Sequence, residues 1–198
     1  MSASRNAAVT SFVTVLIIVT AGLLLNIFLG PEGGTNSEVT SRPGEFAYKR
    51  TALVTAAYFL FFYLAVFYQS MIGLQVWNEL KSGSSGTKKD DDASKQEVSL
   101  WEVKYGPISY EDKRMVAGNR VVGNTLEQMP AFLMGLWLTA VTTTDGHASL
   151  CGWIYLIFRA SYGYFYNTNP NLVLLATFPN YITVAYLWIT IARACLDV

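Results

Sequence analysis

The chain contains little charge, and long stretches contain none. Only 14% of its 198 residues are charged, whereas a soluble domain has about a quarter. Residues 11–29, 51–78 and 171–192 include no charged side chain, and each run meets the roughly 18 residues that a membrane-spanning helix needs. This distribution excludes an ordinary soluble globular protein and predicts an integral membrane protein.

Histidine and cysteine are also scarce. The chain has one histidine and two cysteines, Cys151 and Cys195, which both lie in apolar segments without Cys-x-x-Cys spacing. We interpret the cysteines as small buried hydrophobes rather than a disulfide or metal pair. The single histidine and the missing Cys-x-x-Cys spacing also argue against a zinc site, so we expect no metal. The formal net charge is zero and no basic stripe is present, so we expect no nucleic-acid partner.

Two further apolar stretches, residues 115–144 and 148–166, are long enough to cross a membrane but include charged side chains. The sequence therefore predicts five spans in an all-α membrane protein. The first apolar run has 19 residues, longer than the roughly 7–15 of a signal-peptide core, and no small-x-small cleavage pattern follows it. We interpret that run as a retained anchor.

Two polar insertions divide the chain into an N-terminal anchor with a polar loop (1–50) and a bundle (51–198). Residues 81–114 form a flexible loop whose first half, rich in Ser, Gly, Lys and Asp, is typical of disorder. Its second half, residues 99–110, has the aromatic and apolar content of a segment at the membrane surface. The connections at 143–147 and 167–171 are short, so the last three spans are predicted to be antiparallel neighbours.

More than half of the 14 Lys and Arg residues lie between residues 81 and 120. The positive-inside rule therefore places the long loop in the cytoplasm. Ionisable residues inside spans are costly and are functional candidates. Together with neighbouring polar residues they form two stripes at helical spacing, each on one face: Arg120, Asn124 and Glu127 in the third span, and Arg159, Tyr162 and Tyr166 in the fourth.

The two stripes supply guanidiniums for carboxylates, a carboxylate for an amine, and an amide and phenols for further hydrogen bonds. A small ligand with both carboxylate and ammonium groups, such as a short peptide, matches this set. A structural interpretation stays open beside it. In that alternative Arg120 extends to the interface, Glu127 pairs with Arg159, and the tyrosines belong to an interfacial belt.

The runs that carry these residues resemble a known family. Residues 120–133 read Arg-Val-Val-Gly-Asn-Thr-Leu-Glu-Gln-Met-Pro-Ala-Phe-Leu, and residues 150–166 and 73–81 also match family helices. The chain resembles the membrane-associated proteins in eicosanoid and glutathione metabolism, the MAPEG family, and is most similar to its microsomal glutathione transferase 3-like branch. The resemblance implies a four-helix transmembrane bundle, here with one additional N-terminal transmembrane helix.

The resemblance further implies a homotrimer that binds glutathione between subunits near the cytoplasmic face. Arg120 and Arg159 would bind its carboxylates, Glu127 its amine, and Asn124, Tyr162 and Tyr166 would orient it. Lys81 occupies the place where catalytic members have an arginine. Lys81 and Arg159, the second cation of the binding stripes, are therefore the catalytic candidates.

The chain also departs from the family pattern. Catalytic members have a second arginine, which stabilises the glutathione thiolate, near the position of Val173. Residues 167–192 contain no Lys or Arg. Gln128 replaces the tyrosine that follows the family's glutamate.

Two functions remain open. The first is a glutathione-dependent transferase or peroxidase that acts on lipophilic electrophiles in the bilayer of the endoplasmic reticulum or another organelle. The alternative is a catalytically silent lipid- or glutathione-binding scaffold, or a structural subunit of a larger membrane assembly.

Overall fold

The computed structural model describes residues 47–84 and 98–196, and these residues are helical without any strand. The elements are α2 (Lys49–Ser84), α3 (Leu100–Tyr105), α4 (Ile108–Glu111), α5 (Lys113–Thr142), α6 (Asp145–Thr168), the 3-10 helix η2 (Pro170–Leu172) and α7 (Val173–Leu196). The predicted all-α fold is confirmed. The predicted N-terminal span at residues 11–29 and residues 85–97 of the predicted loop lie outside the described residues. Residues 81–84, predicted as the start of that loop, belong to α2 instead.

The four other predicted spans coincide with α2, α5, α6 and α7. Two helices are long and apolar enough to cross a membrane by composition alone, Lys49–Ser82 with 34 residues and Val173–Leu196 with 24. At 1.5 Å per residue they measure about 51 and 36 Å, and both exceed a hydrocarbon core of about 30 Å. Helices α5 and α6 have 30 and 24 residues, and they contain the charged residues that the sequence singled out.

The chain divides into two compact units, which are described separately. Unit 1 comprises the described residues up to Phe61 together with those from Thr125 onward, and unit 2 is Phe62–Asn124. Helices α2 and α5 each contribute to both units. Helix α5 continues through Pro130 without a break in its assignment.

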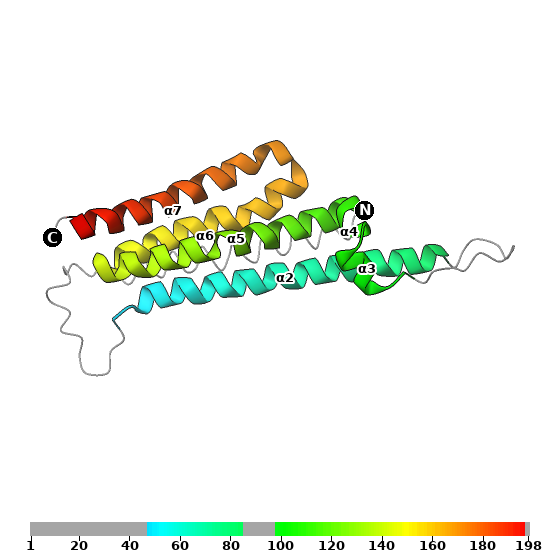
Figure 1. Cartoon of the computed structure of the whole chain (residues 1–198), viewed down its shortest axis with the longest axis horizontal. Coiled ribbons are helices and arrows are strands. Elements are labelled where there is room, and N and C mark those ends of the chain that lie inside the picture. The colour runs from blue at the N-terminus through cyan, green and yellow to red at the C-terminus, as the bar shows by residue number, and fades with distance from the viewer. Residues whose placement is uncertain (1–46, 85–97, 197–198) are drawn as a thin grey trace, which may run out of the picture. The chain divides into compact units, whose positions relative to one another are not determined.

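Unit 1 is built on close packing between helices. In Figure 1, α6 and α7 (yellow to red) lie side by side and run in opposite directions, as their short connection predicts. Phe132 of α5 stacks on Tyr155 of α6, with ring centroids 3.8 Å apart. A Cβ added to Gly152 would lie only 2.5 Å from Val54 Cγ1, so the absence of a side chain there permits α6 to approach α2 closely.

Side chains form hydrogen bonds with backbone groups at the helix ends of unit 1. The Asp145 carboxylate accepts hydrogen bonds from the backbone N–H groups of Arg50 (3.0 Å) and Thr51 (2.9 Å), which lie in the first turn of α2 and have no partner within that helix. Helix α6 ends two residues beyond the predicted span. Its last turn is closed by Asn167 and Thr168, whose side chains donate to the carbonyls of Gly163 and Tyr164.

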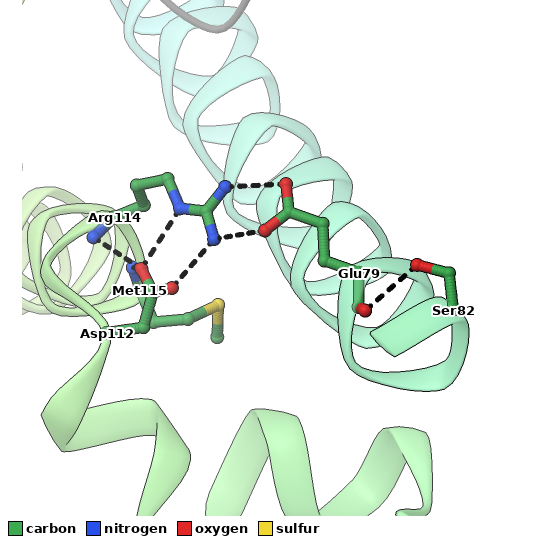
Figure 2. Close-up of polar contacts among 5 residues, drawn as sticks. All are labelled: Glu79, Ser82, Asp112, Arg114 and Met115. Carbon is green, nitrogen blue, oxygen red and sulfur yellow. Dashed lines mark hydrogen bonds and ion pairs between the residues drawn. The ribbon is translucent and has the colours of Figure 1, made fainter. Parts of the chain in front are cut away.

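Unit 2 joins the end of α2 to the start of α5. Figure 2 shows Arg114 donating from both terminal nitrogens to the Glu79 carboxylate (2.9 and 2.8 Å), while Nη2 also donates to Asp112 (2.8 Å). Asp112 also accepts from the backbone N–H of Arg114 at 2.8 Å, and this caps the first turn of α5. Hydrogen bonds from Arg114 hold the pKa of the Asp112 carboxyl below its usual range.

Candidate functional site

Arg159 is the most unusual polar residue of unit 1. Its side chain is 1% exposed, and its Nε donates a hydrogen bond to the Thr125 hydroxyl at 3.1 Å. Both terminal nitrogens, Nη1 and Nη2, are buried and have no hydrogen-bond partner among the described residues. A buried cation with unpaired donors is costly, so this guanidinium is suited to receive an anion.

The guanidinium is held in place from two helices. Its carbon lies 5.3 Å from the ring centroid of Tyr162, one turn further along α6, within the range of a cation–π contact. Thr125 belongs to α5, and its backbone carbonyl accepts a hydrogen bond from the Tyr58 hydroxyl of α2 at 2.8 Å. Three helices of unit 1 therefore determine where Arg159 lies and leave its fork of terminal donors available for a planar anion.

One turn before Arg159, a second polar contact joins α5 and α6. The fully buried Tyr155 donates from its hydroxyl to Gln128 Oε1 at 3.0 Å. Gln128 is the residue that departs from the family pattern in the sequence. Its amide oxygen faces the interior of unit 1 and satisfies a phenol that burial would otherwise leave without an acceptor.

The remaining predicted ligands of unit 1 differ in burial. Tyr162 is 4% exposed, and its ring centroid is 6.0 Å from that of Tyr166, which is half-buried. Glu127 is exposed and forms no ion pair with Arg159 in the part of the chain that the structure describes. The structural alternative in which Glu127 and Arg159 pair within one chain is therefore not realised.

Three predicted residues belong to unit 2. Arg120 is exposed on α5 and Asn124 is half-buried on the same helix. Lys81 is exposed near the end of α2, and its ammonium lies 5.1 Å from the centroid of the Trp77 ring. The roles of these three residues in ligand binding stay predictions from the sequence.

Thr125 is the site residue that the sequence analysis missed. It lies inside the Asn-Thr-Leu-Glu run, but it is not on the face shared by Asn124 and Glu127, and a hydroxyl in an apolar helix usually bonds to its own backbone. The available signal was a small polar residue inside an apolar span beside a polar stripe. The structure gives it the role of holding Arg159.

The site's chemistry is that of anion recognition. Arg159 offers two parallel N–H donors of the kind that match a carboxylate, and the buried Tyr162 ring covers the guanidinium on one side. Among the described residues, no group of three or more His, Cys, Asp or Glu side chains is arranged to hold a metal ion. A separate open hollow in unit 1, lined by Thr143, Tyr186 and Arg193 among others, contains none of the predicted site residues.

Comparison with known proteins matches the sequence of the chain to one family. The MAPEG family model matches residues 50–193. The leukotriene C4 synthase of Cavia porcellus is 37% identical over 73 residues, and that of Mus musculus is 36% identical over 73 residues. Each alignment covers 37% of this chain and 47% of the relative, so the chain spans about half the length of the curated relatives it matches. The family model covers most of the chain, including every helix that carries a predicted ligand, and the protein is a member of the MAPEG family of integral membrane proteins.

Proposed function

We propose that this protein is a membrane-embedded, glutathione-dependent transferase or peroxidase that acts on lipophilic electrophiles. The observation that carries the proposal is the buried Arg159 guanidinium, whose two terminal nitrogens have no partner among the described residues. Family membership and the leukotriene C4 synthase relatives support glutathione as the co-substrate. In this mechanism the thiolate of glutathione attacks the electrophile, while the protein holds the tripeptide and lowers its thiol pKa.

In this proposal Arg159 binds one glutathione carboxylate, and Tyr162 and Tyr166 orient the tripeptide beside it. Glu127 binds the amine, and Arg120 and Asn124 are the predicted ligands from unit 2. Arg120 and Glu127 are exposed in the single chain. Their exposure is consistent with a site completed by a second copy in a homotrimer, because a charged side chain facing lipid would be costly.

A second candidate function is a glutathione- or lipid-binding scaffold without chemistry, alone or in a larger membrane assembly. It is favoured by the prediction from the sequence that the position near Val173, where α7 begins, lacks the thiolate-stabilising arginine of the family pattern. A free thiol with a pKa near 8.5 is only a few per cent ionised at neutral pH, so making it mostly thiolate requires about two pKa units, or ~2.7 kcal/mol.

The test is stopped-flow ultraviolet absorbance of the purified full chain mixed with glutathione, with equilibrium binding measured in parallel. A transferase forms the thiolate band at neutral pH and binds glutathione saturably. Saturable binding without the thiolate band identifies the scaffold instead. Absence of any binding contradicts both forms of the glutathione proposal.

A further inference from the structure

The exposed surface of α3 in unit 2 carries large aromatic side chains. Trp101 is 68% exposed and Tyr105 is 58% exposed, and their ring centroids lie 5.6 Å apart. Lys104 places its ammonium 5.5 Å from the centroid of the Tyr105 ring. Trp101, Lys104 and Tyr105 thus form one continuous patch, which we call the α3 aromatic face.

The opposite side of α3 is anchored on the membrane-spanning helix. Val103 is fully buried in a cluster with Ile72, Val76 and Met115. The Trp77 indole of α2 donates to the Val98 carbonyl at 2.9 Å, just before α3 begins. Helix α3 therefore has a determined orientation against the last turns of α2, in which Val103 is buried and the aromatic face stays exposed.

Those last turns are where the span leaves the hydrocarbon. The charge-free run of α2 ends at Asn78, and Glu79 and Lys81 follow. The span of 34 residues exceeds the hydrocarbon thickness by about 20 Å, so part of it extends into the head-group layers. Since α3 packs beside residues 72–77, near the end of the charge-free run, we expect its aromatic face at the depth of the membrane interface, where Trp and Tyr are enriched.

We propose that the α3 aromatic face binds the head-group region of the bilayer and fixes the second half of the long loop against the membrane. Trp and Tyr suit this layer because each has an apolar ring and a polar group. The recognition depends on the aromatic rings rather than on net charge. Lys104 is the only basic residue on the face, and Glu102, on the same short helix, offsets its charge.

The segment that holds α3 against α2 also contacts Trp77, which lies beside the candidate catalytic residue Lys81. Trp77 is fixed by its bond to the Val98 carbonyl, and Lys81 lies over the Trp77 ring. Attachment of α3 to the interface therefore limits where the Lys81 ammonium can move. This inference concerns the membrane alone and stands whether or not the protein activates glutathione.

The test uses the full chain in phosphatidylcholine vesicles, with lipids brominated near the head group or near the chain end and with iodide in the water. Subtracting the fluorescence of Trp101→Phe from that of the wild type isolates Trp101. Trp188→Phe is the matched control, because Trp188 is 39% exposed in the α7 span and should be shielded from iodide.

We expect the Trp101 emission to be quenched at least ~2-fold more by bromine near the head group than by bromine near the chain end, as for an interfacial residue. Adding anionic phosphatidylserine should not change this pattern. Quenching by iodide without quenching by bromolipid would place the face in water and overturn the proposal. Protection from both quenchers would show that protein covers the face, through a second copy or a partner, and would overturn it equally.

Discussion

Replacing Arg159 with methionine should have opposite effects on stability and on ligand binding. Methionine has a similar length and no charge, so Arg159→Met removes a buried cation whose terminal nitrogens have no described partner. Replacing a buried ion pair by well-packed apolar side chains is often neutral or stabilising by about 1–4 kcal/mol, and an unpaired buried cation is costlier than a paired one. Against this, the Thr125 hydroxyl loses one donor at 3.1 Å, at a cost of about 1 kcal/mol. Without glutathione, the variant should therefore be as stable as the wild type or more stable.

The affinity for glutathione, in contrast, should fall in Arg159→Met. Truncating one partner of a buried, hydrogen-bonded charge pair costs about 2–5 kcal/mol, which corresponds to a Kd raised roughly 30-fold to several thousand-fold. Arg159→Lys retains the charge but lacks both the planar fork and the Nε donor that Thr125 accepts, so its Kd should lie between those of the wild type and the methionine variant.

Calorimetric titration of the full chain in detergent micelles gives Kd, and thermal unfolding with and without glutathione gives the two stabilities. Bound ligand stabilises the wild type by RT ln(1 + [L]/Kd), and at the same glutathione concentration this increment should be smaller in Arg159→Met. A Kd within ~3-fold of the wild type would refute the reasoning, because less than 1 kcal/mol would then depend on the guanidinium. A ligand-free variant destabilised by more than ~2 kcal/mol would refute it as well, since the guanidinium would then have a partner in the free protein.

Three further predictions concern the fold. Gly152→Ala should lower the free energy of unfolding by about 1–3 kcal/mol, because the new methyl overlaps Val54, and Val54→Ala should restore part of the loss in the same thermal assay. Asn180→Leu should raise the unfolding temperature, because the Asn180 amide is fully buried without a partner among the described residues and leaving such a group unsatisfied costs about 1–3 kcal/mol. A lower unfolding temperature would mean that the amide has a hydrogen-bond partner in the folded protein. Asp112 has a pKa depressed by Arg114, so its contribution to stability is present above the unfolded-state pKa and is lost as pH falls through the folded one; acid titration of helicity should show a larger loss in the wild type than in Asp112→Asn, in which Glu79 still pairs with Arg114.

The helices were largely predictable from the sequence because their signals are strong. Charge-free runs and apolar stretches of more than 18 residues located α2, α5, α6 and α7, since hydropathy over such a length depends little on neighbouring elements. The end of α6 was less predictable. Asn167 and Thr168 read as loop residues by composition, but in the structure their side chains bond back to the last turn.

The site was predictable as a set of residue types but not as a set of contacts. Helical spacing placed Asn124 and Glu127 on one face, and the structural alternative to a ligand site paired Glu127 with Arg159. In the structure Thr125 contacts Arg159 instead. Helix spacing gives the relative direction of side chains on one helix, but the rotation of α5 against α6 is set by packing such as the Phe132–Tyr155 stack, which pattern alone does not specify.

Binding glutathione and ionising its thiol are separate demands, and in the proposed site Arg159 serves only the first. Its Nε is engaged by Thr125, which leaves one fork of two terminal nitrogens, and a fork of that kind matches a single carboxylate. The carboxylates of glutathione lie at the two ends of the tripeptide, away from the central cysteine, so a cation bound to one of them is badly placed to stabilise the thiolate. At saturating glutathione, Arg159→Met should therefore leave the pKa of the bound thiol unchanged even though Kd rises, and ultraviolet titration of the thiolate measures that pKa directly. A raised thiol pKa in this variant would mean that Arg159 faces the sulfur, and the assignment of its fork to a carboxylate would then be wrong.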